Sequence, residues 1–494
     1  MAGDRVTEPP YRRVSDGADR DATPGGVRSS LAEKLRGWPP VLVDLGIEAR
    51  DAVLAARRAL HNGTTLQMEL VAASLVREET LYRTLADHLG LQFLDTIDPE
   101  RLTLGSTEAM SLLGSMGPVH AVRYIEEGST TSILVAPDRF DLEAMYRWVA
   151  RRPESEVRLR LVTPSAYREA LVHRARPALV DRARDGLFTA MPHMSARFAT
   201  TGWQGMVLGA LLVALPVSAF VVPVWSLFAI HIVATLFFFG CVVLRYRAAL
   251  DFRPLPVDPP KPLDPMEAPV YTVLIALYQE AEVVPELLVA LGRIVWPRAK
   301  LQVRLVCERD DRATIEAIRL HGLRSWIDVI EVPLGMPRTK PNALAYALPQ
   351  TSGELVVLYD AEDRPHPLQL VEAWHRFRDD DPGLACLQAP IDIDNASAGL
   401  IPRLFAAEYA ALFRGLLPWL ARRGLLLRWA ARPIISAAPR LRKWRAGTLT
   451  TSPRMPISAC GLPASASAPG SCRCRRWRMR RTHSRSGCAS APAG

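Results

Sequence analysis

The chain has 494 residues, of which 49% are hydrophobic, so it is long enough for two or three domains with a sizeable core. Its net charge of +10 is unevenly distributed, because residues 428–494 carry 14 Lys or Arg and no Asp or Glu, which leaves residues 1–427 at −4. The mildly acidic body therefore argues against nucleic acid as a partner.

The seven cysteines do not indicate a disulfide framework. Cys241, Cys307 and Cys386 each stand alone in apolar surroundings, which is typical of buried thiols in a reducing compartment. The other four follow residue 428, and there Cys472 and Cys474 are too close together for the usual zinc-binding spacing.

The N-terminal third predicts a disordered tail followed by a small α/β domain. Residues 1–30 are polar and charged and contain no signal peptide, so we expect them to be disordered. Within residues 31–175, apolar spacing predicts helices from Ile47 to Leu60 and from Glu79 to His88, with a stop at Gly63 or Gly90 after each. We expect three short strands and a last helix to follow, at residues 91–93, 131–135, 157–162 and 164–171.

The run from Leu70 to Leu91 resembles the N-terminal domain of type II secretion ATPases, which also precedes some bacterial glycosyltransferases. Some domains of that kind bind cyclic di-GMP through paired Arg, Leu, Gly and Gln motifs. The resemblance implies a site for cyclic di-GMP or a protein partner, or else a docking or structural module. No clean motif pair occurs here, which favours the docking or structural module.

Residues 205–244 contain no Asp, Glu, Lys or Arg. One helix needs about 20 apolar residues to cross a bilayer, so this segment predicts a two-helix transmembrane hairpin that turns near Phe220. Arg197 lies before the hairpin, and Arg245 and Arg247 follow it, so we expect both ends in the cytoplasm. The alternative, a buried helix of a soluble domain, fits a charge-free stretch of this length poorly.

Residues 245–269 include a proline-rich stretch, which predicts an extended, semi-rigid linker. Beyond it, residues 270–427 alternate apolar, β-branched runs with helical patterns. The expected strands are at 270–277, 303–307, 329–332 and 354–359, and the expected helices at 285–294, 313–321 and 341–348. This alternation predicts an α/β fold with an open, mostly parallel sheet.

Polar clusters follow three of the predicted strands: residues 278–280, 308–311 and 360–363. Ligands bind open parallel sheets at the carboxyl ends of the strands, so the three clusters are expected to meet in one crevice. Carboxylates there could hold a divalent cation, which neutralises the charge of a diphosphate leaving group. The alternative is that these clusters are only solvated turns.

Three segments resemble family 2 glycosyltransferases of the processive, cellulose-synthase-like membrane branch. Residues 269–281 resemble the opening strand, residues 338–344 the Lys-containing segment, and residues 360–363 the metal-binding DxD motif in a DxE form. Residues 405–413 resemble the amphipathic interface helix of that branch. The resemblance implies a GT-A-like sheet domain that takes a nucleoside diphosphate sugar as donor.

The same resemblance assigns roles to individual side chains. It implies that Glu308 and Asp310 contact the uridine or guanosine part of the donor, that Lys340 lies near the nucleotide or phosphate, and that Glu280 is a further substrate-binding residue. It also implies that the two acidic residues of the DxE motif, Asp360 and Glu362, hold Mg²⁺ or Mn²⁺.

The second half of that family's site is missing from the sequence as written. The family carries a catalytic Asp in a Thr-Glu-Asp motif and, further on, a Gln-x-x-Arg-Trp motif, and neither occurs here. After Leu427 the composition shifts abruptly to Arg, Ala, Ser, Pro and Cys. Codons compatible with residues 428–494, read two bases along, permit Gly-Gly, Ser-Asn-His-Phe, Thr-Glu-Asp and Gln-Arg-Thr-Arg-Trp in the family's order.

We therefore interpret residues 428–494 as a frame-shifted, disordered tail; the alternative is a basic tail that binds anionic lipid or nucleic acid. The intact protein is expected to be an inverting, processive glycosyltransferase that extends a polysaccharide at the cytoplasmic face of a bacterial inner membrane. The chain as written lacks its general base and is expected to be inactive. The alternatives are a non-catalytic membrane docking or signalling module and a nucleotidyltransferase.

Overall fold

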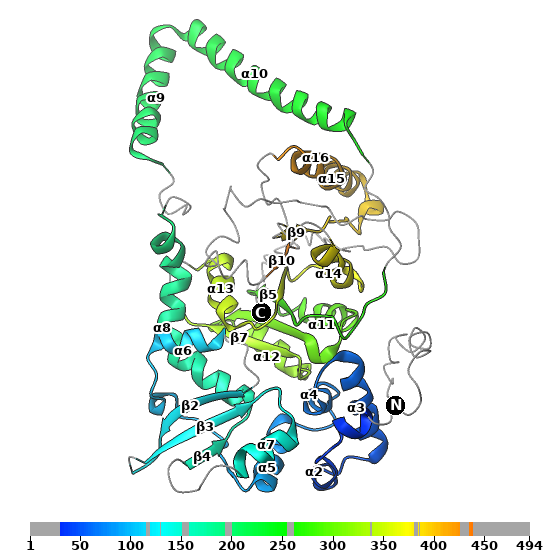
Figure 1. Ribbon diagram of the computed structural model, residues 1–494. Helices are drawn as coiled ribbons and strands as arrows, with labels where there is room; N and C mark the ends of the chain where they lie inside the picture. The colour runs from blue at the N-terminus through cyan, green and yellow to red at the C-terminus, as the bar shows by residue number, and fades with distance from the viewer. Residues whose placement is uncertain are drawn as a thin grey trace, which may run out of the picture.

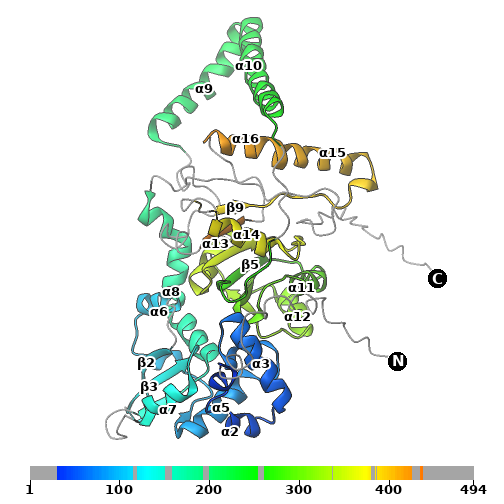
Figure 2. The ribbon, with the colours of Figure 1, turned by 45° about the vertical axis from the view of Figure 1, so that its right-hand side comes forward.

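The computed structural model describes residues 30–114, 119–128, 130–150, 158–192, 200–253, 261–335, 338–379, 384, 386–424 and 434–437. Its parts are arranged in three tiers (Figure 1, Figure 2). A small α/β domain forms one end, a six-stranded sheet with its helices lies in the middle, and two long apolar helices project at the other end.

The first tier begins with four helices: α2 (Pro39–Asp44), α3 (Ala49–Asn62), α4 (Leu66–Ala72) and α5 (Glu78–Leu89). The structure places the two longest within two residues of their predicted limits. Helix α3 ends at Gly63 and α5 at Gly90, and both glycines adopt the left-handed conformation that favours glycine at a helix C-terminus. One face of α3 is lined by small alanines, which lets the helix pack closely against α4.

These helices pack on a four-stranded sheet in the order β1-β4-β3-β2. The strands are β1 (Gln92–Phe93), β2 (Val119–Ile125), β3 (Thr131–Pro137) and β4 (Arg158–Leu161). Strands β1, β4 and β3 are parallel and match the predicted positions, whereas β2, which was not predicted, runs antiparallel to β3. A 3-10 turn, η2 (Pro99–Arg101), and two helices, α6 (Ser106–Leu113) and α7 (Leu142–Ala150), complete the domain.

Helix α8 (Pro164–Ala190) joins the first two tiers. The sequence predicts this helix only through Leu171, but it continues for a further 19 residues even though Pro177 lies inside it. Its buried side chains share one core cluster with Leu274 and Val306 of the six-stranded sheet. The small domain is therefore built onto the sheet through a continuous apolar core.

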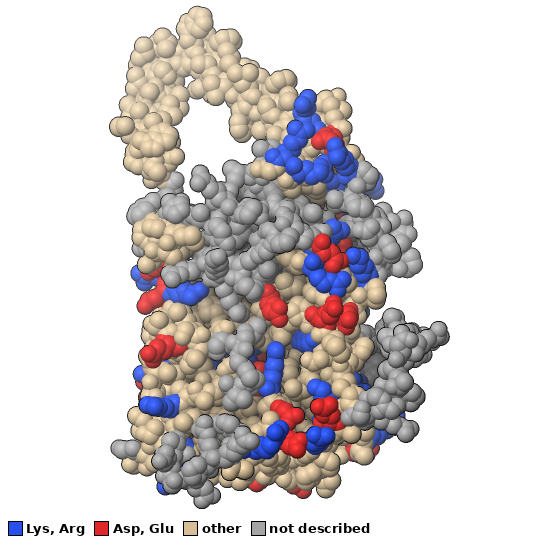
Figure 3. Space-filling model, viewed as in Figure 1, with Lys and Arg blue, Asp and Glu red and all other residues tan. Residues whose placement is uncertain are grey.

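The third tier is a pair of helices, α9 (Gly202–Val221) and α10 (Pro223–Leu250). They reverse at Val222, close to the predicted turn, and their mean hydropathies are 2.0 and 2.6. Neither helix is buried inside the protein, and both are long and apolar enough to cross a membrane. Figure 3 shows them as an uncharged surface that projects from the rest of the molecule.

The residues before the six-stranded sheet are held against it. The Lys300 ammonium donates to the carbonyl oxygens of Pro265 (2.8 Å) and Met266 (3.1 Å), and the Trp296 indole donates to that of Pro269 (3.2 Å). The sequence predicts an extended linker over 245–269. In the structure α10 runs through Leu250, and the described residues 261–269 are docked against the sheet domain.

The six strands lie in the order β7-β6-β5-β8-β10-β9. Their limits are β5 (Tyr271–Leu277), β6 (Leu301–Glu308), β7 (Ile327–Val332), β8 (Leu355–Tyr359), β9 (Cys386–Gln388) and β10 (Ile434–Ala437). The first four in this order are parallel, as predicted, and β10 runs antiparallel to both β8 and β9. Strand β5 is buried at every position, which explains its unbroken apolar sequence.

Helices cover both faces of this sheet. The limits of the main ones are α11 (Val284–Gly292), α12 (Arg312–Leu320), α13 (Lys340–Ala347) and α14 (Gln369–Asp379). The short turns are η4 (Arg298–Lys300), η5 (Leu348–Gln350) and η6 (Ala396–Ala398). Alternate residues of β5 point into two clusters: Val273 packs with the side of α11 and α14, and Leu274 packs with α13 and α8.

A last helical segment lies between the sheet and α10 (Figure 2). It consists of α15 (Leu400–Ala410), a π-helical turn η7 (Ala411–Leu416) and α16 (Leu417–Arg422). The guanidinium of Arg422 donates to the carbonyl oxygen of Asp251 at 3.1 Å, just beyond the end of α10. The other side of α15 leaves Leu400 and Ile401 exposed, at 70% and 62% of their surface.

Strand β10 falls within the predicted disordered tail. Residues 434–437 are inserted between β8 and β9, and Ile435 is paired with Val357 and Leu387. The structure thus differs from the sequence-based expectation at these four residues. The two adjacent isoleucines favour a strand because β-branched side chains pack well on a pleated surface. The rest of 428–494 lies outside the described residues.

Candidate functional site

Three loops meet at the carboxyl edge of the six-stranded sheet, as the sequence predicts. They follow β5, β6 and β8, which are neighbours because β5 pairs with both of the others. Cys307 is paired with Leu277, and Tyr359 with Ile275, so the loops leave the sheet within two residues of one another. The predicted polar clusters therefore lie at one edge.

Asp311 connects two of these loops. One of its carboxylate oxygens accepts a hydrogen bond from the backbone of Gln279 (2.5 Å), and the other caps α12 by accepting from the backbone of Thr314 (3.2 Å). The Thr314 hydroxyl in turn accepts from the backbone of Glu280 at 3.1 Å. These bonds hold Gln279 at a φ of 55° and fix the position from which the Glu280 side chain projects.

Glu280 is a half-buried carboxyl among other charges. Burial raises its pKa to about 7; the cation of Lys340 opposes the shift, and the carboxylates of Glu362, Asp360 and Asp311 add to it. Its Oε2 is buried and has no hydrogen-bond partner among the described residues. A carboxyl in this state would be stabilised by a donor or a cation that is brought into the crevice.

Lys340 forms an ion pair with Asp360 at 2.7 Å. The lysine is the first residue of α13, and the Thr339 hydroxyl caps this helix by accepting from the backbone of Asn342. Asp363 fixes the loop on the other side, because its carboxylate accepts from the backbone of Asp360 at 2.8 Å. The arrangement places one cation directly against the predicted DxE motif.

A second set of charged side chains lies at the carboxyl end of β6. The guanidinium of Arg338 forms an ion pair with Asp310 at 2.9 Å, donates to the Tyr278 hydroxyl at 3.3 Å and lies 5.8 Å from the centre of that ring. Glu308 is buried nearby, and burial raises its pKa while Arg338 opposes the shift. Arg338 and Tyr278 were not among the predicted site residues, although their place in the polar clusters was the signal that could have found them.

The acidic residues suit a cation that also binds a ligand. Within the described ranges, no group of three or more His, Cys, Asp or Glu side chains is arranged to hold a metal ion. Mg²⁺ in phosphate-transferring sites is commonly held by one or two carboxylates together with the phosphates themselves and water. Asp360 and Glu362 are residues of the type that such a site uses, and the Oε2 of Glu280 has no hydrogen-bond partner among the described residues.

Residues 268–414 match the protein family described as "Glycosyltransferase like family 2". This segment contains the whole of the crevice described above. No curated protein matches the chain in sequence. The match and the strand order together confirm the predicted fold class, an α/β, GT-A-like, mostly parallel sheet domain.

Several solved structures are similar to the chain. A mannosyltransferase from Pyrobaculum calidifontis in complex with GDP-Man and Mn²⁺ is 20% identical, with 48% of this chain and 68% of that chain covered and a TM-score of 0.34. Glucosyl-3-phosphoglycerate synthase from Mycobacterium tuberculosis with Mn²⁺ and UDP is 14% identical, with 35% of this chain and 57% of that chain covered and a TM-score of 0.24. TarS from S. aureus in complex with UDP-GlcNAc is 18% identical, with 35% of this chain and 46% of that chain covered and a TM-score of 0.26.

Proposed function

We propose that this chain is the donor-binding part of a membrane-bound glycosyltransferase. The enzyme transfers a sugar from a nucleoside diphosphate sugar to a growing polysaccharide with inversion at the anomeric carbon. One observation carries the proposal: the charged loops after β5, β6 and β8 come together at one edge of the sheet, inside the segment that matches a glycosyltransferase family.

Each side chain of the crevice has a proposed task. Asp360 and Glu362 hold Mg²⁺ or Mn²⁺, which when bound neutralises the charge that develops on the diphosphate. Lys340, beside Asp360, contributes a second positive charge to the phosphates. The loop after β6, with Glu308 and Asp310, receives the nucleoside, and Glu280 faces the phosphates from the loop after β5.

The location proposed for the enzyme is the cytoplasmic face of a bacterial inner membrane. Helices α9 and α10 supply two spans, and the exposed apolar side of α15 suits the lipid interface. Figure 3 shows Lys and Arg side chains where α16 approaches the end of α10. Arg422 and Arg423 lie there, and cations at this level are attracted to anionic headgroups.

The acceptor half of the site is proposed to lie in the offset reading frame after Leu427. The chain as written has no Thr-Glu-Asp or Gln-x-x-Arg-Trp motif and therefore lacks the Asp that would deprotonate the acceptor hydroxyl. We accordingly expect the chain to bind a donor without transferring the sugar.

The experiment that tests donor binding is calorimetric titration of the full chain in nanodiscs with UDP or GDP, in the presence of Mn²⁺. The variant Asp360→Ala should lose metal-dependent binding, by about tenfold or more, because a methyl group cannot replace a charged ligand. Asp379→Ala is a matched control that removes an ion-paired carboxylate on α14, outside the crevice, and should bind as the unchanged chain does. Equal affinity of Asp360→Ala and the unchanged chain would refute the metal assignment, and a lack of nucleotide binding by the unchanged chain would favour a non-catalytic membrane docking or signalling module instead.

A further inference from the structure

Helix α13 determines where Lys340 stands. Lys340 is the first residue of this helix, and its ammonium lies 2.7 Å from the Asp360 carboxylate. The pair joins two different elements, α13 and the loop after β8. A small shift or rotation of α13 would therefore separate the two charges.

Helix α13 is enclosed on two sides. Residues 343–347 are all buried, and the helix packs against β5, β6 and β7 on one side and against α8 on the other. Helix α8 belongs to the N-terminal domain, whose core residues Tyr167 and Leu171 lie in the same cluster as Leu344 and Tyr346 of α13. The N-terminal domain thus supplies one wall of the place that α13 occupies.

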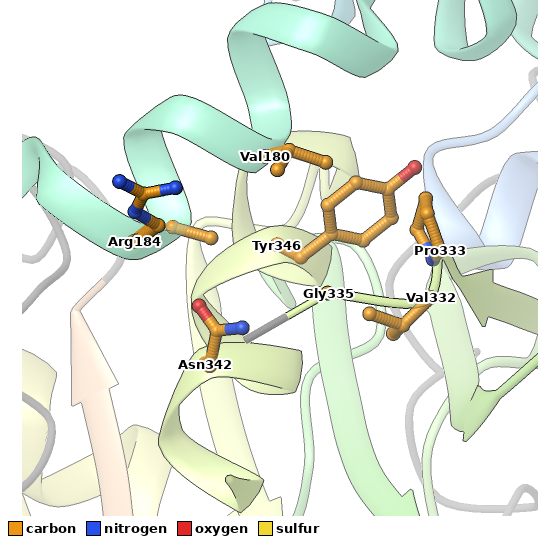
Figure 4. Close-up of a pocket in the computed structure, with 8 residues that line it drawn as sticks. Val180, Arg184, Val332, Pro333, Gly335, Asn342 and Tyr346 are labelled. Atoms are coloured by element: carbon orange, nitrogen blue, oxygen red, sulfur yellow. The ribbon is translucent and has the colours of Figure 1, made fainter. Parts of the chain in front are cut away.

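Tyr346 makes the polar contact across this joint. Its side chain is 2% exposed, and the guanidinium of Arg176 on α8 lies close enough to the hydroxyl to oppose the rise in the pKa of Tyr346 that burial causes. Figure 4 shows the Tyr346 ring between Val180 of α8 and Pro333, which follows β7. The pocket at this seam is lined by side chains of α8, of α13 and of the segment that follows β7.

We propose that Tyr346 is a positioning residue of the donor site, through which helix α8 of the N-terminal domain holds α13 in place and Lys340 beside Asp360. The proposal rests on the donor-binding function assigned above to Lys340. It gives the N-terminal domain a definite role, because a change in that domain that moves α8 changes the charge presented to the donor phosphates.

The test measures the acylation rate of Lys340 by mass spectrometry in the full, metal-free chain. The ion pair and partial burial slow this reaction, and the buried Lys300 serves as an internal reference. Tyr346→Phe and Arg176→Met each remove, from one side, the contact between the buried hydroxyl and the guanidinium. Each should raise the Lys340 rate severalfold, and the double variant should add nothing further, because both changes remove the same interaction.

Tyr82→Phe is the matched control. The hydroxyl of Tyr82 is also buried and donates to the carbonyl oxygen of Pro137, but within the N-terminal domain and away from α13. It should leave the Lys340 rate unchanged. An unchanged rate in Tyr346→Phe, or an equal rise in Tyr82→Phe, would overturn the proposal because general loosening would then explain the result.

A second measurement separates this inference from the proposed function. In nanodiscs with Mn²⁺, Tyr346→Phe should weaken UDP or GDP binding by about fivefold, and by much less when Lys340 is already changed to Met. An equal loss in both backgrounds would count against a role through Lys340. If the unchanged chain binds neither nucleotide but the acylation rates shift as expected, the positioning role stands and the donor-binding function is wrong.

Discussion

At the scale of single residues, the chemistry of the site depends on which carboxyl groups have a hydrogen-bond partner and which have none. Glu280 is the clearest case, because its position is fixed by backbone bonds to Asp311 and Thr314 while its own Oε2 has no hydrogen-bond partner among the described residues. Asp363, by contrast, is buried and satisfied by a backbone donor. One carboxyl of this site is thus left without a partner in the described part of the chain, while another fixes the loop after β8.

The raised pKa of Glu280 predicts a pH-dependent stability. Its pKa rises from an ordinary 4.5 to about 7, so between these values the native protein holds a proton that the unfolded chain releases. Stability from this group is therefore present below pH 4.5 and is lost as the pH rises through 7. In metal-free protein, Glu280→Gln should raise the melting temperature by a few degrees at pH 8 and leave it unchanged at pH 5. The same shift at both pH values would contradict the assignment.

At the scale of elements, the strands of the six-stranded sheet could largely be predicted. Strands β5, β6, β7 and β8 are apolar runs bounded by polar clusters, and their alternation with helices fixed the parallel order. The sheet topology places the predicted side chains at one edge. Their hydrogen-bond and ion-pair partners could not be predicted from the sequence. The pairing of Arg338 with Asp310 and the bracing by Asp311 depend on how the loops fold back on one another.

Other elements could not be predicted, for physical reasons that differ. Helix α8 continues past Leu171 because its second half is stabilised by packing on α13, a contact between distant parts of the chain. Strand β2 depends on antiparallel pairing with β3. Strand β10 lies in a segment whose composition suggests disorder, and it depends on antiparallel pairing with β8 and β9.

Strand β10 leads to a prediction about truncation. Among the described strands, β9 is paired with β10 alone, so a chain that ends at Leu427 should leave β9 without a hydrogen-bonded neighbour. In limited proteolysis, this chain should be cut near residues 380–390 much faster than a chain that ends at residue 440. Equal rates of cleavage would show that β10 does not stabilise the sheet and that the disordered tail begins at residue 428, as the sequence analysis predicts.

At the scale of the whole molecule, the three tiers combine two domains that share an apolar core with a pair of long, exposed apolar helices. The shared core between the N-terminal domain and the sheet makes independent movement of these two parts costly, since separating them would expose buried Leu274 and Val306. The hairpin of α9 and α10 is not part of this core, and nearly all of its apolar surface is exposed. Lipid is the solvent that would cover it.

The hairpin predicts that the N-terminal domain and the sheet share one compartment. Reporter fusions after Arg197 and after Arg247 should therefore give the same cytoplasmic signal, because two spans return the chain to its starting side. Signals from opposite sides of the membrane would contradict the hairpin and would leave only one of the two helices as a span.

The most direct measurement of the central claim is sugar incorporation into polymer by membranes that contain this chain or a version restored to the offset frame after Leu427, supplied with a panel of sugar nucleotides and Mn²⁺. The account predicts that the restored chain transfers sugar from at least one donor and that Asp360→Ala abolishes this transfer. It also predicts that the chain as written transfers none, because its general base is missing. Equal transfer by the two chains, or transfer that survives Asp360→Ala, would contradict it.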